Sequence, residues 1–107
     1  MTTDDVRRVL KTSFMPYKIA LLSYVSLGEL EFDVIYLRYF LLLTQEKAVE
    51  RLPYIYSERL KIPLETAMSE YSISLTGLQK IEYRAIDKCR KAWCKLIFVQ
   101  ELLTTCD

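Results

Sequence analysis

Five cationic side chains recur in the C-terminal part of the sequence at the spacing of one helix face. Lys80, Arg84, Lys88, Lys91 and Lys95 follow one another at steps of three or four residues, and residues at such steps share one side of an α-helix. A row of ammonium and guanidinium groups on one helix suits the phosphates of nucleic acid. The same row is also typical of a helix face that contacts only water. We take the nucleic-acid interpretation as our working hypothesis.

The charge is unevenly distributed along the chain. The 107 residues carry 15 Lys and Arg against 14 Asp and Glu, a formal net charge of +1. Residues 75–95 hold six basic and two acidic residues, whereas residues 1–74 hold nine basic and ten acidic. The nearly neutral total therefore conceals a basic segment of the kind that marks an electrostatic binding surface.

Residue types that carry most catalytic chemistry are scarce. The chain has no histidine and two glycines, so it lacks the usual general base and metal ligand and has no glycine-rich phosphate loop. Cys89, Cys94 and Cys106 form no C-x-x-C pair and follow no secretory signal, which indicates reduced thiols. We expect a cytoplasmic protein that is not an enzyme and has neither metal nor cofactor.

The pattern of apolar residues predicts an all-α fold, a compact domain of five to six helices. We expect one domain over residues 1–107, with N-terminal helices in 1–28, a core helix and connector in 29–63, and a helix-turn-helix with a long last helix in 64–107. The expected helices run from Thr2 to about Phe14, from Pro16 to Gly28, from Glu29 through the apolar repeat Leu30, Val34, Leu37 and Leu41, from Thr44 to Pro53, from Leu64 to Tyr71, and from Ser74 to about Leu103. Pro53 stops or kinks the fourth helix, and residues 54–62 form a connector.

The segment from Leu64 to Arg90 has the pattern of a helix-turn-helix. Pro63 fits the start of a short helix, the tripeptide S-I-S ends it, and Ser74 caps the next helix. The buried stripe of that helix reads Leu78, Ile81, Ala85, Cys89, Trp93 or Ala92, Leu96 and Val99. In such a motif the second helix enters the major groove of DNA.

The same segment, L-E-T-A-M-S-E-Y-S-I-S-L-T-G-L-Q-K-I-E-Y-R-A-I-D-K-C-R, resembles region 4 of primary-type bacterial sigma factors without a gap. The identical residues are Leu64, Glu65, Ser74, Ile81, Glu82, Arg84, Ala85, Lys88 and Arg90, with Ile73, Leu78 and Ile86 as apolar equivalents. Upstream, L-E-F-D-V-I-Y-L-R-Y from Leu30 to Tyr39 resembles the preceding helix of that family. Residues 40–63 form a longer insertion between the two blocks. Small regulators of phages and mobile elements in low-GC Gram-positive bacteria carry domains of this kind.

The resemblance implies contacts with double-stranded DNA near the start of the recognition helix. The family's base-reading positions fall on Leu75, Thr76, Gln79 and Lys80, while Leu75, Gly77 and Gln79 stand where the family has arginines. The resulting candidate DNA-binding residues are Ser74, Thr76, Gln79, Lys80, Tyr83, Arg84, Lys88, Lys91 and Lys95. Thr76, Gln79 and Lys80 can meet base edges or phosphates, and the last three lysines follow the backbone.

A rival helix-turn-helix lies upstream. The run T-Q-E-K-A-V-E-R-L-P-Y-I-Y-S-E-R-L from Thr44 to Leu60 resembles a pattern of phage regulators. Pro53 falls in its turn, and Pro63 leaves few residues for its reading helix, so it ranks second.

An alternative function is a protein-interaction module of the same fold that binds RNA polymerase or another transcription regulator without reading DNA. The absent arginines and the mean hydropathy of +0.08 motivate it. The apolar tail formed by Leu96, Ile97, Phe98, Val99, Leu102 and Leu103 predicts a homodimer or docking onto the N-terminal helices. We expect no membrane span, because the apolar run from Ile35 to Leu43 is far shorter than the roughly 20 residues required.

Overall fold

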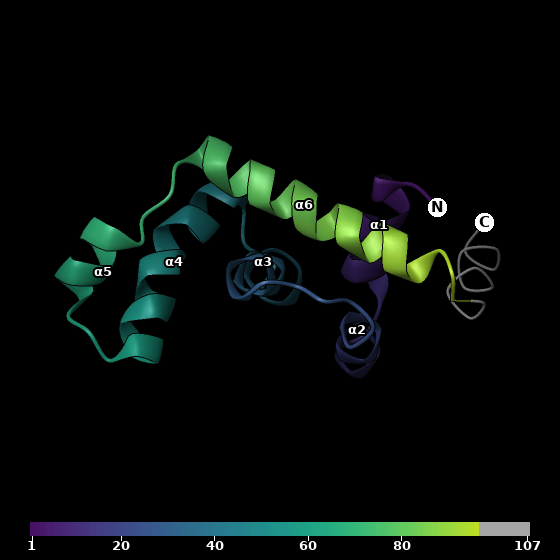
Figure 1. The fold of residues 1–107 in the computed structure, drawn as a ribbon, viewed down its shortest axis with the longest axis horizontal. Helices are drawn as coiled ribbons and strands as arrows, with labels where there is room; N and C mark the ends of the chain where they lie inside the picture. Colours follow the sequence, from purple (N-terminus) through teal and green to yellow (C-terminus); the bar gives the residue numbers. More distant parts are fainter. Residues whose placement is uncertain (97–107) are drawn as a thin grey trace. The chain divides into compact units, whose positions relative to one another are not determined.

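A computed structural model describes residues 1–96, and the all-α prediction is confirmed for this part of the chain (Figure 1). The elements are α1 (Thr3–Thr12), α2 (Met15–Leu22), α3 (Glu29–Ile35), the π-helical turn η1 (Tyr36–Phe40), α4 (Gln45–Leu60), α5 (Leu64–Glu70) and α6 (Leu75–Trp93). These elements form two compact units. One comprises residues 1–28 with the chain from Tyr83 onward, and the other comprises residues 29–82.

The first helix begins where the sequence predicts a cap. The hydroxyl of Thr2 accepts a hydrogen bond from the Asp5 N–H at 3.1 Å, and the Asp5 carboxylate accepts one from the Thr2 N–H at 2.8 Å. The bond from the Thr2 backbone holds the pKa of Asp5 below its ordinary value near 3.8. This reciprocal capping box fixes the start of α1, and Val6, Val9 and Leu10 are buried along one side of the helix.

The second helix is shorter than predicted. It ends at Leu22 rather than at Gly28. The hydroxyl of Ser23 donates to the Ala20 carbonyl at 2.6 Å, and Tyr24 and Val25 donate their N–H groups to Leu21 and Leu22 in tight turns. These local bonds satisfy the last carbonyls of the helix, so the chain leaves it before the glycine.

The core of the second unit joins four of its elements. Buried side chains from α3, η1, α4 and the start of α6 form one cluster of Val34, Leu37, Ala48, Leu52, Leu78 and Ile81. Ile73, from the connection before α6, and Ile55 and Tyr56, from the second half of α4, pack against this cluster. The apolar face of the first turns of α6 is thus packed against α3, η1 and α4.

The fourth helix does not stop at Pro53. It continues to Leu60, so the predicted connector at residues 54–62 is wrong, and so is the rival helix-turn-helix that required a turn at Pro53. A proline inside a helix removes one hydrogen bond at a cost of about 3 kcal/mol. Leu52 before Pro53 is buried in the apolar cluster, and Ile55 and Tyr56 after it are partly buried against the same cluster, so that apolar burial offsets that cost.

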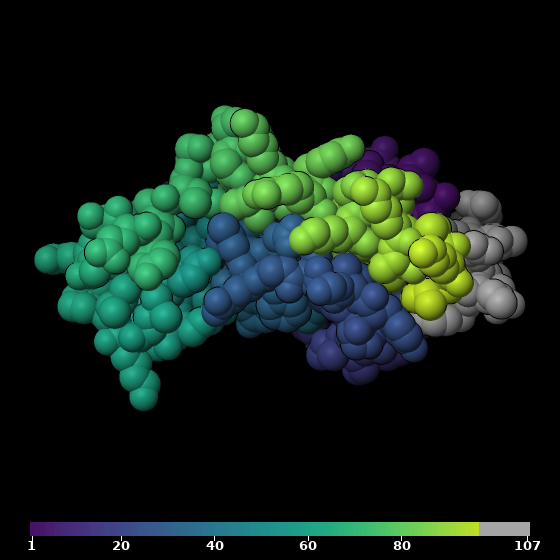
Figure 2. All heavy atoms as spheres, in the orientation of Figure 1, coloured from purple at the N-terminus to yellow at the C-terminus, as the bar shows by residue number. Residues whose placement is uncertain are grey.

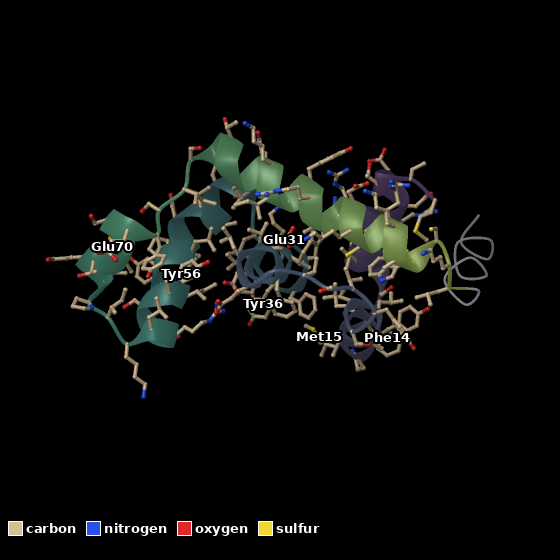
Figure 3. All side chains as sticks on the ribbon, in the orientation of Figure 1. Phe14, Met15, Glu31, Tyr36, Tyr56 and Glu70 are labelled. Atoms are coloured by element: carbon tan, nitrogen blue, oxygen red, sulfur yellow. The ribbon has the colours of Figure 1, made fainter. Side chains whose placement is uncertain are left out.

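The fifth helix packs on the fourth. α5 lies beside α4 in Figure 1, and in Figure 2 the atoms of these two segments adjoin one another. Tyr56 of α4 points toward α5 in Figure 3 and stacks on Tyr71, with ring centroids 4.8 Å apart. Burial raises the pKa of Tyr56, and the nearby Asp33 adds to this rise. The short α5 is therefore held in place by an aromatic pair.

The last helix of the described chain starts as predicted and ends earlier. α6 begins after Ser74 and ends at Trp93 rather than near Leu103, with a tight turn in which the Leu96 N–H donates to the Trp93 carbonyl at 2.9 Å. Residues 97–103 of the predicted helix, and most of the predicted apolar tail, lie outside the described residues. Trp93 is buried, and its indole N–H donates to the Leu21 carbonyl at 2.9 Å within the first unit.

Candidate nucleic-acid interface

All nine candidate DNA-binding side chains are exposed. Thr76, Gln79, Lys80, Tyr83, Arg84, Lys88 and Lys91 lie on α6, Ser74 lies directly before it, and Lys95 lies in the turn after it. The predicted buried stripe occupies other faces of the same helix, where Leu78, Ile81, Ala85, Cys89 and Trp93 are all buried. Periodicity thus separated the buried and exposed faces of α6.

The four basic residues within α6 form a continuous row. Lys80, Arg84, Lys88 and Lys91 differ by steps of four, four and three residues, which keeps them within an arc of about 80° on the helix circumference. The row extends about 17 Å along the helix axis. We call these four residues, with Lys95 after the helix, the basic row.

Members of the basic row differ in their ion pairs. Lys91 Nζ lies 3.2 Å from the Asp87 carboxylate, which also contacts Arg90 at 2.9 Å. The hydrogen bond from Arg90, followed by that from Lys91, holds the pKa of Asp87 below its ordinary value. Within residues 1–96, Lys80 and Arg84 make no ion pair. These two cations therefore need break no ion pair to meet a phosphate.

The start of α6 is tightly built around Ser74. The Ser74 hydroxyl accepts a hydrogen bond from the Gly77 N–H at 3.0 Å, which confirms the predicted cap. A Cβ atom at position 77 would meet the Ser74 hydroxyl oxygen at 3.3 Å. Glycine at position 77 therefore leaves room for the Ser74 hydroxyl to approach the backbone closely. The oxygen of Ser74 is engaged in the cap, and its proton remains available to donate to an acceptor.

A partly buried ion pair joins the second turn of α6 to η1. The Glu82 side chain is only 4% exposed, and its Oε1 accepts a hydrogen bond from Arg38 Nε at 2.5 Å. Arg38 also donates to the Leu43 carbonyl at 2.7 Å, so one guanidinium joins α6, η1 and the loop before α4. A charge-assisted pair that is also hydrogen-bonded to the backbone orients the elements it joins.

The Glu82 carboxylate also contacts a side-chain amide, and that amide is hydrogen-bonded to a second amide on the exposed face of α6. Gln45 Nε2 at the start of α4 lies 3.4 Å from Glu82 Oε2, and Gln79 Nε2 lies 3.0 Å from Gln45 Oε1. We call Glu82, Gln45 and Gln79 the amide relay. The sequence analysis did not predict it, although Glu82 lies four residues after the stripe residue Leu78 and therefore on the apolar face of the helix.

Apart from the basic row, the second unit has an apolar hollow. A cavity of about 490 Å³ opens between η1 and α4, lined by Tyr36, Leu37, Leu41, Leu43, Arg51, Tyr54, Ile55 and Glu58. Tyr36, labelled in Figure 3, is 38% exposed, Tyr54 is 46% exposed and Leu41 is 50% exposed. Leu42 beside them is 67% exposed and has φ of 56°, a left-handed conformation that is unfavourable for leucine.

The described chain offers little else in the way of reactive groups. Cys89 is a buried thiol and Cys94 a partly buried one, neither of them in a disulfide, whereas Cys106 lies outside the described residues. Within residues 1–96, no three residues of the metal-binding types come together. None of the helices in this range combines the length and apolar character needed to cross a bilayer.

Comparison with protein-family models, with curated proteins and with solved structures finds no match to this chain.

Proposed function

We propose that the protein is a DNA-binding transcriptional regulator that uses a sigma region 4-like helix-turn-helix, of phage or mobile-element origin. The observation that carries the proposal is the face of α6 that bears Lys80 and Arg84. Both cations are exposed and have no ion pair in the described chain, while Ile81 and Ala85 beside them are buried. α5 and α6, joined by residues 71–74, supply the expected pair of helices.

In this proposal the first turns of α6 contact bases, and the later turns contact phosphates. Thr76, Gln79 and Lys80 read base edges from the early turns, and Tyr83 and Arg84 follow along the groove. Lys88, Lys91 and Lys95 contact phosphates and carry no sequence information. Ser74 donates its hydroxyl proton to a phosphate while its oxygen caps the helix.

Reversing two charges on the basic row tests the proposal. The double variant Lys80→Glu/Arg84→Glu should lower affinity for duplex DNA by at least about 100-fold near 0.1 M salt, because two phosphate or base contacts are lost. Fluorescence anisotropy with a labelled duplex measures the change. The matched control is Lys11→Glu/Lys47→Glu, which makes the same change in net charge at exposed residues of α1 and α4. Equal losses in both variants would contradict binding through α6.

The second candidate function is a protein-interaction module of the same fold that binds RNA polymerase or another transcription regulator. The apolar hollow on η1 and α4 favours it, because Tyr36, Leu41 and Tyr54 expose apolar surface beside a left-handed Leu42. Exposed apolar patches of this kind mark contact surfaces. A stable complex with polymerase, together with no duplex binding at low salt, would select this function over the first.

A further inference from the structure

The amide relay determines which polar groups Gln79 shows to a ligand. The first step lies at Glu82, whose side chain is 4% exposed and paired with Arg38. An ionised carboxylate accepts hydrogen bonds and donates none. The group that faces Glu82 Oε2 from Gln45 must therefore be the amide nitrogen rather than the amide oxygen, as the 3.4 Å contact has it.

The second step follows from the geometry of an amide. With its nitrogen turned toward Glu82, Gln45 turns its oxygen toward Gln79, one turn earlier on α6, and this oxygen accepts a hydrogen bond from Gln79 Nε2 at 3.0 Å. An amide oxygen cannot donate, so Gln79 must present its own nitrogen to Gln45. The negative charge at Glu82 thus fixes the orientation of both amides.

The third step concerns the groups of Gln79 that remain. The side chain is exposed, and after the bond to Gln45 it retains one N–H and the oxygen. One donor beside one acceptor matches the major-groove edge of adenine, which offers the N6 amino group and the N7 acceptor. Guanine offers two acceptors, O6 and N7, and would need both N–H groups of the amide.

We propose that Gln45 is a positioning residue that makes Gln79 select adenine over guanine at the base pair it contacts. The inference rests on the proposed DNA-binding function. Gln45 reaches no base in this scheme, and it acts by engaging one of the two N–H groups of Gln79. Without it the Gln79 amide can rotate and offer two donors to guanine or a donor and an acceptor to adenine.

The experiment uses the full chain and duplex DNA with about ten randomised base pairs. Wild type and Gln79→Ala are each selected against this pool, and the position where Gln79→Ala loses its preference is the base pair of Gln79. Affinities for the adenine and guanine duplexes at that position are then measured for each variant. We expect wild type to favour adenine by roughly tenfold, the discrimination typical of a paired amide contact.

Two substitutions at position 45 separate the role of its acceptor from its role in packing. Gln45→Met keeps the length of the side chain and removes both polar groups, so its adenine to guanine ratio should fall to within about twofold of one. Gln45→Glu keeps an acceptor for Gln79 Nε2 but places a second carboxylate beside Glu82. It should retain the adenine preference while lowering overall affinity and thermal stability. Glu46→Gln, in the same turn of α4 and exposed, is the control and should leave the ratio unchanged.

A measurement without DNA checks the relay itself. In the free protein, Gln45→Met should shift the side-chain NH₂ resonances of Gln79, because it removes the acceptor at 3.0 Å from Gln79 Nε2. Unchanged Gln79 resonances, an unchanged base ratio in Gln45→Met, or a wild-type preference for guanine would each overturn the inference. If no duplex binds even at about 50 mM salt, where phosphate contacts are strong, the proposed DNA-binding function fails and the inference fails with it.

Discussion

Arg59 joins α4 to α3 through two carboxylates. Its two terminal nitrogens donate to the two oxygens of Asp33 at 2.9 and 2.6 Å, and one of them also donates to Glu29 at 2.6 Å. The Asp33 side chain is 4% exposed, whereas that of Arg59 is 35% exposed. These bonds raise the pKa of Arg59 further above its already high ordinary value. The buried carboxylate therefore depends on one partly exposed arginine.

Arg59→Met should lower the free energy of unfolding by about 2–3 kcal/mol, because it leaves the buried Asp33 charge without a partner. Urea unfolding followed by circular dichroism measures this change. Adding Asp33→Asn to the variant should recover part of the loss, since the uncompensated charge is then removed.

Arg51→Met is the matched control on the same helix. Arg51 is exposed, and the contact recorded for it is with the Tyr54 ring at 5.8 Å from the centroid. Its removal should change stability by no more than about 0.5 kcal/mol. A similar small effect at Arg59 would show that the clamp on Asp33 contributes little.

Residue-level features that follow a helical period could be predicted from the sequence, and those that depend on distant pairing could not. The exposure of Lys80 and Arg84 and the burial of Ala85 and Cys89 follow from spacing alone. The partner of Glu82 is Arg38, 44 residues earlier. No local pattern brings these two together, because the pairing needs η1 and α6 to be packed first.

At the scale of elements, helix starts were easier to predict than helix ends. Thr2, Thr44 and Ser74 each cap a helix with a side-chain oxygen, as a hydroxyl before an apolar repeat indicates. Ends have weaker signals, because α4 continues through Pro53, whose neighbours pack in the apolar cluster, and α6 ends at Trp93 in a tight turn. The π-helical turn η1, in which Leu41 donates to Tyr36 at 3.0 Å, also has no signal of its own in the sequence.

The end of α4 supports a prediction about stability. Lys61 closes the helix in the left-handed region, with φ of 55° and its N–H bonded to the Ser57 carbonyl. Glycine adopts this conformation without the steric cost that a Cβ atom brings. Lys61→Gly should therefore be more stable than Lys61→Ala by about 1 kcal/mol, measured by thermal or urea unfolding.

The comparison between these two variants isolates the backbone effect, since both remove the lysine charge near the helix end. Glu58→Gly is a further control inside the helix, where glycine should lower stability by about 1 kcal/mol relative to alanine. If Lys61→Gly proved no more stable than Lys61→Ala, the left-handed cap would not govern the end of α4.

At the scale of the whole molecule, the chain combines two compact units with an uneven charge. Residues Leu75 to Glu82 of α6 belong to the second unit, and residues Tyr83 to Trp93 belong to the first. Its exposed face carries the basic row, whereas residues 1–74 are nearly balanced in charge. Any long-range attraction for an anionic partner therefore comes from one helix rather than from the net charge of +1.

This distribution makes salt dependence a sharp test of where DNA is bound. Each phosphate contact contributes about 0.9 to the slope of log affinity against log salt. Lys88→Gln/Lys91→Gln should therefore reduce the slope by about two, with little change in sequence preference, because these lysines lie in the phosphate-contacting part of the proposed surface. Lys11→Gln/Lys47→Gln removes the same net charge from exposed residues of α1 and α4, and should leave the slope as it is in wild type. Equal reductions in both pairs would mean that the overall charge, and not the row on α6, attracts DNA.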